Sequence, residues 1–156
     1  MNSRILALVV AISPGLAGAA TTCAFSSTPG MSFGAYADAS ASPTDAATSI
    51  VVVCSRNGGP TPTTVVLQAG PSANSGLIAT RQMRSGTNLM NYNLYRDSGR
   101  SQVWGQTSGV DTGSISLTVP NNGSANGTLV IYGRIPALQN VPAGAYGDSV
   151  QITVTP

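Results

Sequence analysis

Two aspartates of this chain lie in triplets that could carry acid–base chemistry. Asp97 begins the triplet Asp-Ser-Gly and Asp111 begins Asp-Thr-Gly, and both match the pattern found in aspartic proteases. Such enzymes need two carboxylates that share one proton across a two-fold interface, and these two aspartates are too close in the sequence to lie in two similar lobes. Since aspartate hydrogen-bonds its own backbone in turns and glycine accepts a positive φ, both triplets are predicted to be turns.

Three absent residue types exclude most hydrolytic mechanisms. The sequence has no histidine, lysine or glutamate, and its charged residues are seven arginines and five aspartates. Without histidine there is no Ser-His-Asp or Cys-His machinery and no imidazole metal ligand, and without lysine there is no Ser-Lys dyad or Schiff base. The segment Gly147-Asp148-Ser149 resembles a lipase block, but without a histidine to activate the serine it is predicted to be a turn. We therefore expect no enzyme activity, no metal and no cofactor.

Three other features could serve binding, and each has a plainer interpretation. Trp104 is the only tryptophan; it is expected to anchor the core, with sugar stacking as the alternative. Asn122 and Asn126 begin N-glycosylation patterns, but Gly/Asn sequences of this kind are also typical of turns. Nucleic-acid binding is not expected, because it needs clustered basic residues and the arginines are spread along the chain.

The first 20 residues are typical of a secretory signal peptide. Arg4 precedes an apolar run over residues 5–12, and small residues follow at 17–20, which is the pattern of a cleaved leader. The apolar run is shorter than the about 20 residues that span a bilayer; the alternative is a buried first strand or helix. Cleavage is expected after Ala19 or Ala20, which leaves one domain, residues 21–156.

Two cysteines, Cys23 and Cys54, belong to this exported part. An even count in an exported chain favours a disulfide, and two free thiols are the alternative.

The remaining sequence predicts an all-β domain. Short β-prone runs alternate with clusters of Gly, Ser, Thr, Asn and Pro, as in a β-sandwich or barrel. Residues 48–55 and 128–136 are the most continuously apolar, so they are expected to be central strands. Period-2 alternation predicts one buried face at 114–119 and at 149–155. Further strands are expected at 23–27, 31–36, 63–70, 81–97 with a break at Ser85-Gly86, and 101–105, and a loop is expected at 121–127.

Three blocks together resemble the spore coat protein U domain family. They are "NLMNYNLYRD" followed by "VWG", "YGRIPALQNVPAGAYGDSVQITVTP" near the end, and "CAFSSTPGMSFGAYADASASPTDAATSIVVVC" at the start; Met90 stands where the family signature has a leucine. The signature residues are assigned to core and corner positions rather than to a ligand site. They are Tyr92, Leu94, Tyr95, Asp97, Trp104, Gly105, Tyr132, Gly133, Arg134, Pro136, Gly144, Tyr146 and Asp148.

Two of these residues have specific expected contacts. Tyr146 precedes an alternating strand, as in the corner of immunoglobulin-like sandwiches where a tyrosine hydroxyl bonds the backbone upstream. Arg134 is expected to pair with Asp97 or Asp148.

The resemblance implies an immunoglobulin-like sandwich that lacks its last strand. In the family's archaic chaperone-usher pili, a periplasmic chaperone lends the missing strand and a neighbouring subunit then replaces it, a form of β-augmentation. The final segment is apolar and strand-like, and an open apolar edge invites a partner. The acceptor groove is expected between the first and last strands, with Phe25, Val150, Ile152 and Val154 as its candidates. The implied partners are the chaperone, an outer-membrane usher, and neighbouring pilus or coat subunits, at the cell surface after periplasmic transit.

The region before Cys23 departs from polymerising pilins. A donor strand needs about ten residues to fill four or five pockets, and the expected mature chain has only Thr21 and Thr22, with or without Ala20. An acceptor without a donor would be a terminal or tip-like fibre subunit, or a coat protein that does not polymerise head to tail. The alternative function is a secreted carbohydrate- or surface-binding module.

Overall fold

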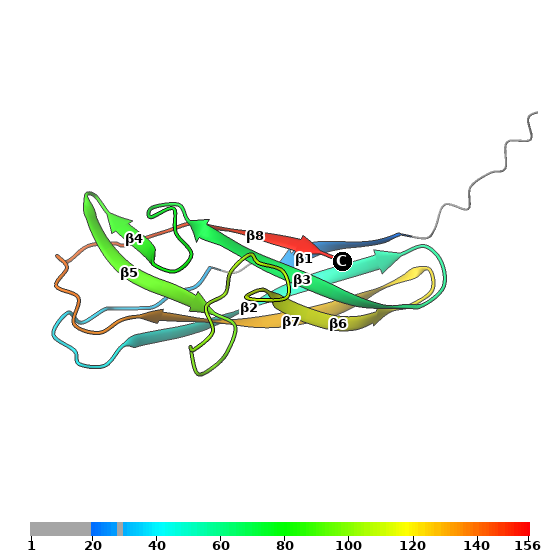
Figure 1. The fold of residues 1–156 in the computed structure, drawn as a ribbon, viewed down its shortest axis with the longest axis horizontal. Helices are drawn as coiled ribbons and strands as arrows, with labels where there is room; N and C mark the ends of the chain where they lie inside the picture. The colour runs from blue at the N-terminus through cyan, green and yellow to red at the C-terminus, as the bar shows by residue number, and fades with distance from the viewer. Residues whose placement is uncertain (1–19, 28–29) are drawn as a thin grey trace, which may run out of the picture.

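A computed structural model describes residues 20–27 and 30–156. In this part of the chain, strands form two antiparallel sheets in the orders β1-β2-β7-β5-β4 and β6-β3-β8, packed around one apolar core (Figure 1). The predicted all-β sandwich is confirmed. The strands are β1 (Thr21–Ser27), β2 (Thr44–Arg56), β3 (Thr61–Ser72), β4 (Arg81–Ser85), β5 (Asn88–Tyr95), β6 (Gly113–Val119), β7 (Gly123–Ile135) and β8 (Val150–Thr155).

Alternating apolar residues build the core from both sheets. Ile50 and Val52 of β2 point inward from the larger sheet, and Val65 and Leu67 of β3 from the smaller; all four are buried. Because successive side chains of a strand point to opposite faces, each of these strands has a polar or half-exposed residue between its buried ones. The predicted central positions of 48–55 and 128–136 are confirmed, since β2 and β7 lie inside the larger sheet.

The disulfide between Cys23 and Cys54 is present. The two cysteines lie directly opposite each other in the pairing of β1 with β2, with their Cα atoms 4.1 Å apart. The bridge therefore fastens an edge strand to the interior of its sheet.

Two predicted strands are wrong. Residues 31–36 belong to no strand, although Met31, Phe33 and Tyr36 pack half-buried against the core. Residues 101–105 form a single bridge, between Tyr95 and Val103. The reason is that this second segment crosses between the sheets, where the Trp104 N–H bonds the Leu94 carbonyl at 2.9 Å and the Gly105 carbonyl accepts from Ala69 N–H at 2.9 Å.

The predicted loop at 121–127 is also wrong, because β7 begins at Gly123 and pairs with β2 along its whole length. Only Asn121 and Asn122 turn the chain, and Asn122 has a positive φ of 48°. A Cβ on Gly127 would lie 2.5 Å from Ile115 Cγ2. Glycine at this position thus permits close packing of β7 on β6 and does not mark a loop.

Two strand edges are open on the same side of the sandwich. β1 pairs with β2 and β8 pairs with β3, and within the described ranges neither has a second partner. The two strands belong to different sheets and lie side by side (Figure 1). No helix in residues 20–27 and 30–156 is long and apolar enough to cross a membrane. The predicted signal peptide, residues 1–20, falls outside the description except for Ala20.

Candidate functional site

A groove runs along the open side of the sandwich. One wall is the segment 30–38, and the other is the segment 141–148 with the start of β8. Two hollows deepen the groove, an inner hollow of about 400 Å³ and an end hollow of about 550 Å³. Met31, Phe33, Met83 and Tyr146 line both hollows, so the two are continuous.

The lining of the inner hollow is the core of the sandwich. Ile50, Leu94 and Ile131, which are buried core residues, form part of its surface. Of the predicted groove residues, Val150 and Ile152 line this hollow. Phe25 and Val154 line neither hollow but pack half-buried against the same core. The interior of the protein is thus reachable from the open side.

Half of the partly buried residues that pack against the core line these two hollows. Apolar burial stabilises by roughly 25 cal/mol for each Å² removed from water, so half-exposed core side chains leave part of this stabilisation unrealised. A strand laid in the groove would cover them. They are Met31, Phe33, Tyr36, Val141, Tyr146, Val150 and Ile152.

The floor of the groove depends on Gly133. A Cβ at this position would collide with the sulfur of Met31 and with the ring of Phe33, 2.6 Å from its Cζ. Phe33 in turn meets Tyr92 edge-on, with ring centroids 6.0 Å apart. The missing side chain therefore lets the unpaired segment 30–36 lie against β7.

The second wall is held by a tyrosine corner. The Tyr146 hydroxyl donates to the carbonyl of Pro142 at 2.9 Å, as its sequence context predicted. The backbones of Arg84 and Gly147 exchange two hydrogen bonds of 2.8 and 3.0 Å, which attach the wall to β4. Gly144 lies at the same corner, where a Cβ would be 2.5 Å from Ser85 Oγ.

Asp148 fixes the chain just before β8. Its Oδ2 accepts from the Tyr92 hydroxyl at 2.7 Å, and its Oδ1 accepts from Asn74 Nδ2 at 3.0 Å. Burial raises the pKa of Tyr92, and the hydrogen bond to Asp148 raises it further, so the phenol stays protonated. The lipase-like triplet is thus a structural connection between β5 and the start of β8.

Trp104 and Gly105 lie away from the groove, between the two sheets. The Trp104 ring is fully buried and its N–H donates to the Leu67 carbonyl at 3.0 Å. A Cβ on Gly105 would collide with the carboxylate of Asp111. That carboxylate accepts the Thr107 N–H at 2.6 Å, so the Asp-Thr-Gly triplet supports a turn, as predicted. A buried ring offers no surface on which a sugar could stack.

Arg134 pairs with Asp45, so the prediction of Asp97 or Asp148 is wrong. Arg134 Nε and Nη2 donate to the two carboxylate oxygens at 2.8 and 2.9 Å. The two residues are opposite partners on β7 and β2. The hydrogen bond from Arg134 lowers the pKa of Asp45. Arg100 also reaches Asp45, at 3.3 Å.

Asp97 instead caps its own turn. Its carboxylate accepts the backbone N–H groups of Gln102 and Ser101 at 2.8 and 3.1 Å, and these bonds, chiefly the first, lower its pKa. Tyr95 and Tyr132 are opposite partners on β5 and β7 and are half-buried on the outer face, so their predicted core positions are wrong. Arg100 lies 5.7 Å from the Tyr132 ring centroid. The Pro136 carbonyl accepts from the Tyr36 hydroxyl at 3.0 Å.

Arg81 is the main residue that the sequence analysis missed. Its side chain is fully buried, and it donates to the carbonyls of Ala69, Gly70 and Trp104 and to Asn93 Oδ1. Burial lowers its pKa. Arg81 lies two residues before buried Met83 and so shares its face of the strand, whereas Arg84 is exposed. This alternation is the one sequence signal that separates the two arginines.

A match to a protein family covers most of the chain. The model of the Spore Coat Protein U domain matches residues 8–153. The chain belongs to this family. Among the described residues, this Spore Coat Protein U domain holds no group of three Cys or Asp side chains placed to bind a metal ion.

Two relatives extend the comparison. Protein U of Myxococcus xanthus is 36% identical over 88 residues, which cover 54% of this chain and 46% of Protein U. The fold is similar to a solved chain of the CsuC–CsuE chaperone–tip adhesion subunit pre-assembly complex from the archaic chaperone-usher Csu pili of Acinetobacter baumannii. That match has a TM-score of 0.52 and 21% identity, and covers 86% of this chain and 39% of the other. The chain thus matches less than half the length of either relative, and the second likeness is one of fold.

Proposed function

We propose that this Spore Coat Protein U domain is a non-enzymatic structural subunit that accepts an extended strand from a partner. The open groove is the observation that carries the proposal, because its inner hollow reaches core side chains beside the unpaired edge of β8. A strand in the groove would hydrogen-bond to a free edge and bury the half-exposed core side chains, which is β-augmentation.

The lining defines the chemistry of the incoming strand. Val150 and Ile152 face the groove, while Gln151 and Thr153 face solvent. Since side chains alternate on a strand, the partner should carry apolar residues at every second position. The acidic groups at the hollows, Asp38 and Asp148, accept hydrogen bonds from uncharged donors, so their negative charge is not neutralised by these bonds.

Family and fold together support the kind of partner. A Spore Coat Protein U domain with the fold of a subunit solved in a chaperone complex is expected to bind a periplasmic chaperone first and a neighbouring pilus or coat subunit afterwards, with an outer-membrane usher as the site of exchange. The chain would then act at the cell surface after export.

The ability to donate a strand is a separate question. The prediction that the mature chain begins at or just after Ala20, and therefore only accepts, concerns residues outside the described ranges. Amino-terminal sequencing of the exported protein tests it: a mature chain that retains residues 5–12 would carry a candidate donor and overturn the acceptor-only role.

Peptide binding tests the groove directly. The exported chain is mixed with synthetic peptides that match the N-terminal extensions of related subunits, and its melting temperature and migration on native gels are measured. We expect a higher melting temperature with these peptides and no effect from scrambled peptides that have lost the alternation. A chain that is stable, monomeric and indifferent to all of the peptides would refute strand acceptance.

Two substitutions on β8 form a matched pair for the same assay. Ile152→Arg places a charge in the inner hollow and should abolish peptide binding. Thr153→Arg places the same side chain on the exposed face and should leave binding unchanged. Equal effects of the two variants would contradict binding in the groove.

A further inference from the structure

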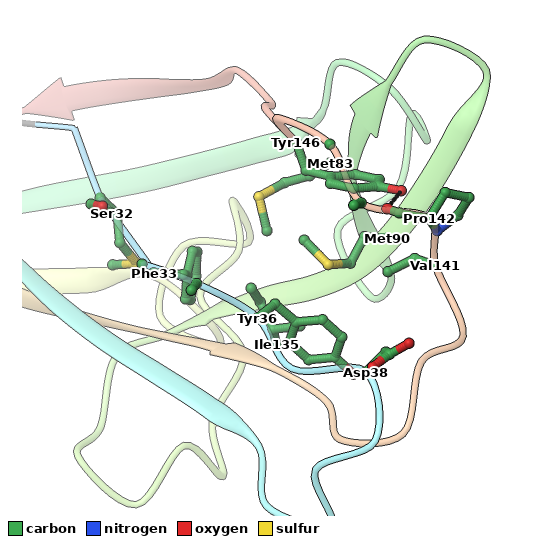
Figure 2. A pocket seen from close by; sticks show the side chains of 15 residues that line it. Ser32, Phe33, Tyr36, Asp38, Met83, Met90, Ile135, Val141, Pro142 and Tyr146 are labelled. Carbon is green, nitrogen blue, oxygen red and sulfur yellow. Dashed lines mark hydrogen bonds between the residues drawn. The ribbon is translucent and has the colours of Figure 1, made fainter.

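Methionine is concentrated at one end of the groove. The chain has four methionines, and Met31, Met83 and Met90 line the end hollow. Met83 and Met90 are opposite partners on β4 and β5, and Met31 comes from the other wall. Figure 2 shows the Met83 and Met90 side chains pointing into the space between Tyr146 on one side and Phe33 and Tyr36 on the other.

The three thioethers line a space that a small reagent can enter. The hollow of about 550 Å³ lies on the open side of the sandwich, where no strand covers it. Met31 is half-buried, and Met83 and Met90 are 8% and 4% exposed. Their aromatic and aliphatic neighbours, such as Phe33 and Val141, offer no chemistry that competes for a mild oxidant.

We propose that Met31, Met83 and Met90 are an oxidation site that closes the groove to its partner strand. The oxidant is hydrogen peroxide: a thioether sulfur lone pair attacks one peroxide oxygen and the O–O bond breaks. The hydroxide that leaves takes the proton from the oxygen now bound to sulfur, so methionine sulfoxide and water are formed. The reaction turns a flexible apolar side chain into a polar one and is reversed by methionine sulfoxide reductases. The inference rests on the proposed strand-accepting function of the same groove.

The change in polarity explains the closure. A sulfoxide oxygen on Met83 or Met90 would share the hollow with Phe33, Ile135 and Val141, and with the polar residues Ser32, Tyr36 and Asp38. The apolar side chains of an incoming strand would bury this oxygen without offering it a hydrogen-bond donor. Burial of an unpaired polar group is unfavourable. The empty groove is therefore the sensitive state, and a bound strand that shields the three sulfurs protects it.

Peptide mapping after oxidation tests the site. The exported chain is treated with hydrogen peroxide, with and without a bound strand peptide, and digests are analysed by mass spectrometry. We expect a mass gain of one oxygen at Met31, Met83 and Met90 in the free chain, with slower gain in the peptide complex. Absence of oxidation at these residues in the folded chain would overturn the inference, and so would equal rates with and without peptide.

Peptide affinity before and after peroxide tests the closure. The oxidised wild type should bind about tenfold more weakly or worse, as expected for an uncompensated dipole in an apolar site, and methionine sulfoxide reductase should restore binding. The control is the triple variant Met31→Leu, Met83→Leu, Met90→Leu, since leucine conserves volume; its affinity should not respond to peroxide.

The outcomes separate the two proposals. If the untreated wild type binds no strand peptide, the proposed function fails, while the mapping still reports whether the methionines are oxidised. If the untreated chain binds but peroxide leaves its affinity unchanged, or weakens the wild type and the triple variant equally, the closure is refuted and strand acceptance stands.

Discussion

The substitution Arg81→Met should severely lower the free energy of unfolding of the domain. The Arg81 guanidinium is fully buried. Its shortest bonds to backbone, 2.7 Å to the Gly70 carbonyl and 2.8 Å to the Trp104 carbonyl, join β4 to β3 and to the segment that crosses between the sheets. Methionine has a similar stem but provides none of these donors.

The magnitude follows from the acceptors left behind. A buried acceptor that loses its donor costs about 1–3 kcal/mol. The carbonyls of Ala69, Gly70 and Trp104 lose the guanidinium, whereas Asn93 Oδ1 keeps a 2.9 Å bond from Leu94 N–H. Removal of a buried charge offsets part of this loss, so we expect a fall in the free energy of unfolding of about 3–5 kcal/mol.

Urea unfolding followed by fluorescence measures this loss. Trp104 is the only tryptophan and is buried beside Arg81, so its emission reports the loss of this core. Both proteins should be measured with a strand peptide bound, which keeps the groove in the same state. The matched control is Arg84→Met, an exposed arginine of the same strand, which should change stability by less than about 0.5 kcal/mol. A loss of under about 1 kcal/mol for Arg81→Met would refute the reasoning.

Three further predictions concern the edges and the outer face. Asp45→Asn should lower stability at neutral pH. The Arg134 hydrogen bond lowers the folded pKa of Asp45 below its usual 3.8. The stabilisation by the ionised carboxylate is therefore present above pH 3.8 and is lost as the pH falls through the folded pKa. Urea titrations should show a difference in the free energy of unfolding between variant and wild type at neutral pH that becomes smaller near pH 3. Replacement of Cys23 and Cys54 by serine should cost about 3–4 kcal/mol on the chain-entropy model, and a smaller loss on calorimetry would show that the β1 edge is held by other contacts. Tyr146→Phe removes the hydroxyl that closes its corner, and should lower the melting temperature and weaken strand-peptide affinity; unchanged affinity would show that the corner does not shape the groove.

Local pattern and residue inventory determined the fold class and much of the chemistry. Alternation located β6 and β8, and the continuous apolar runs located the central strands β2 and β7. The cysteine count predicted the disulfide, and the lack of histidine and lysine removed the common hydrolytic mechanisms. The predictions of the strands and of the disulfide succeed because strand period and cysteine pairing depend on residue types and short spacings.

Only the tertiary structure decided which distant residues meet. Arg134 faces Asp45 because of the β2–β7 register, and residues 31–36 pack against the core without joining a described strand. Arg81 became buried, and three methionines from two walls converged on one hollow. A periodic sequence reports which face of a strand is buried, whereas the neighbour across that face depends on how the two sheets stack and where an edge is left open.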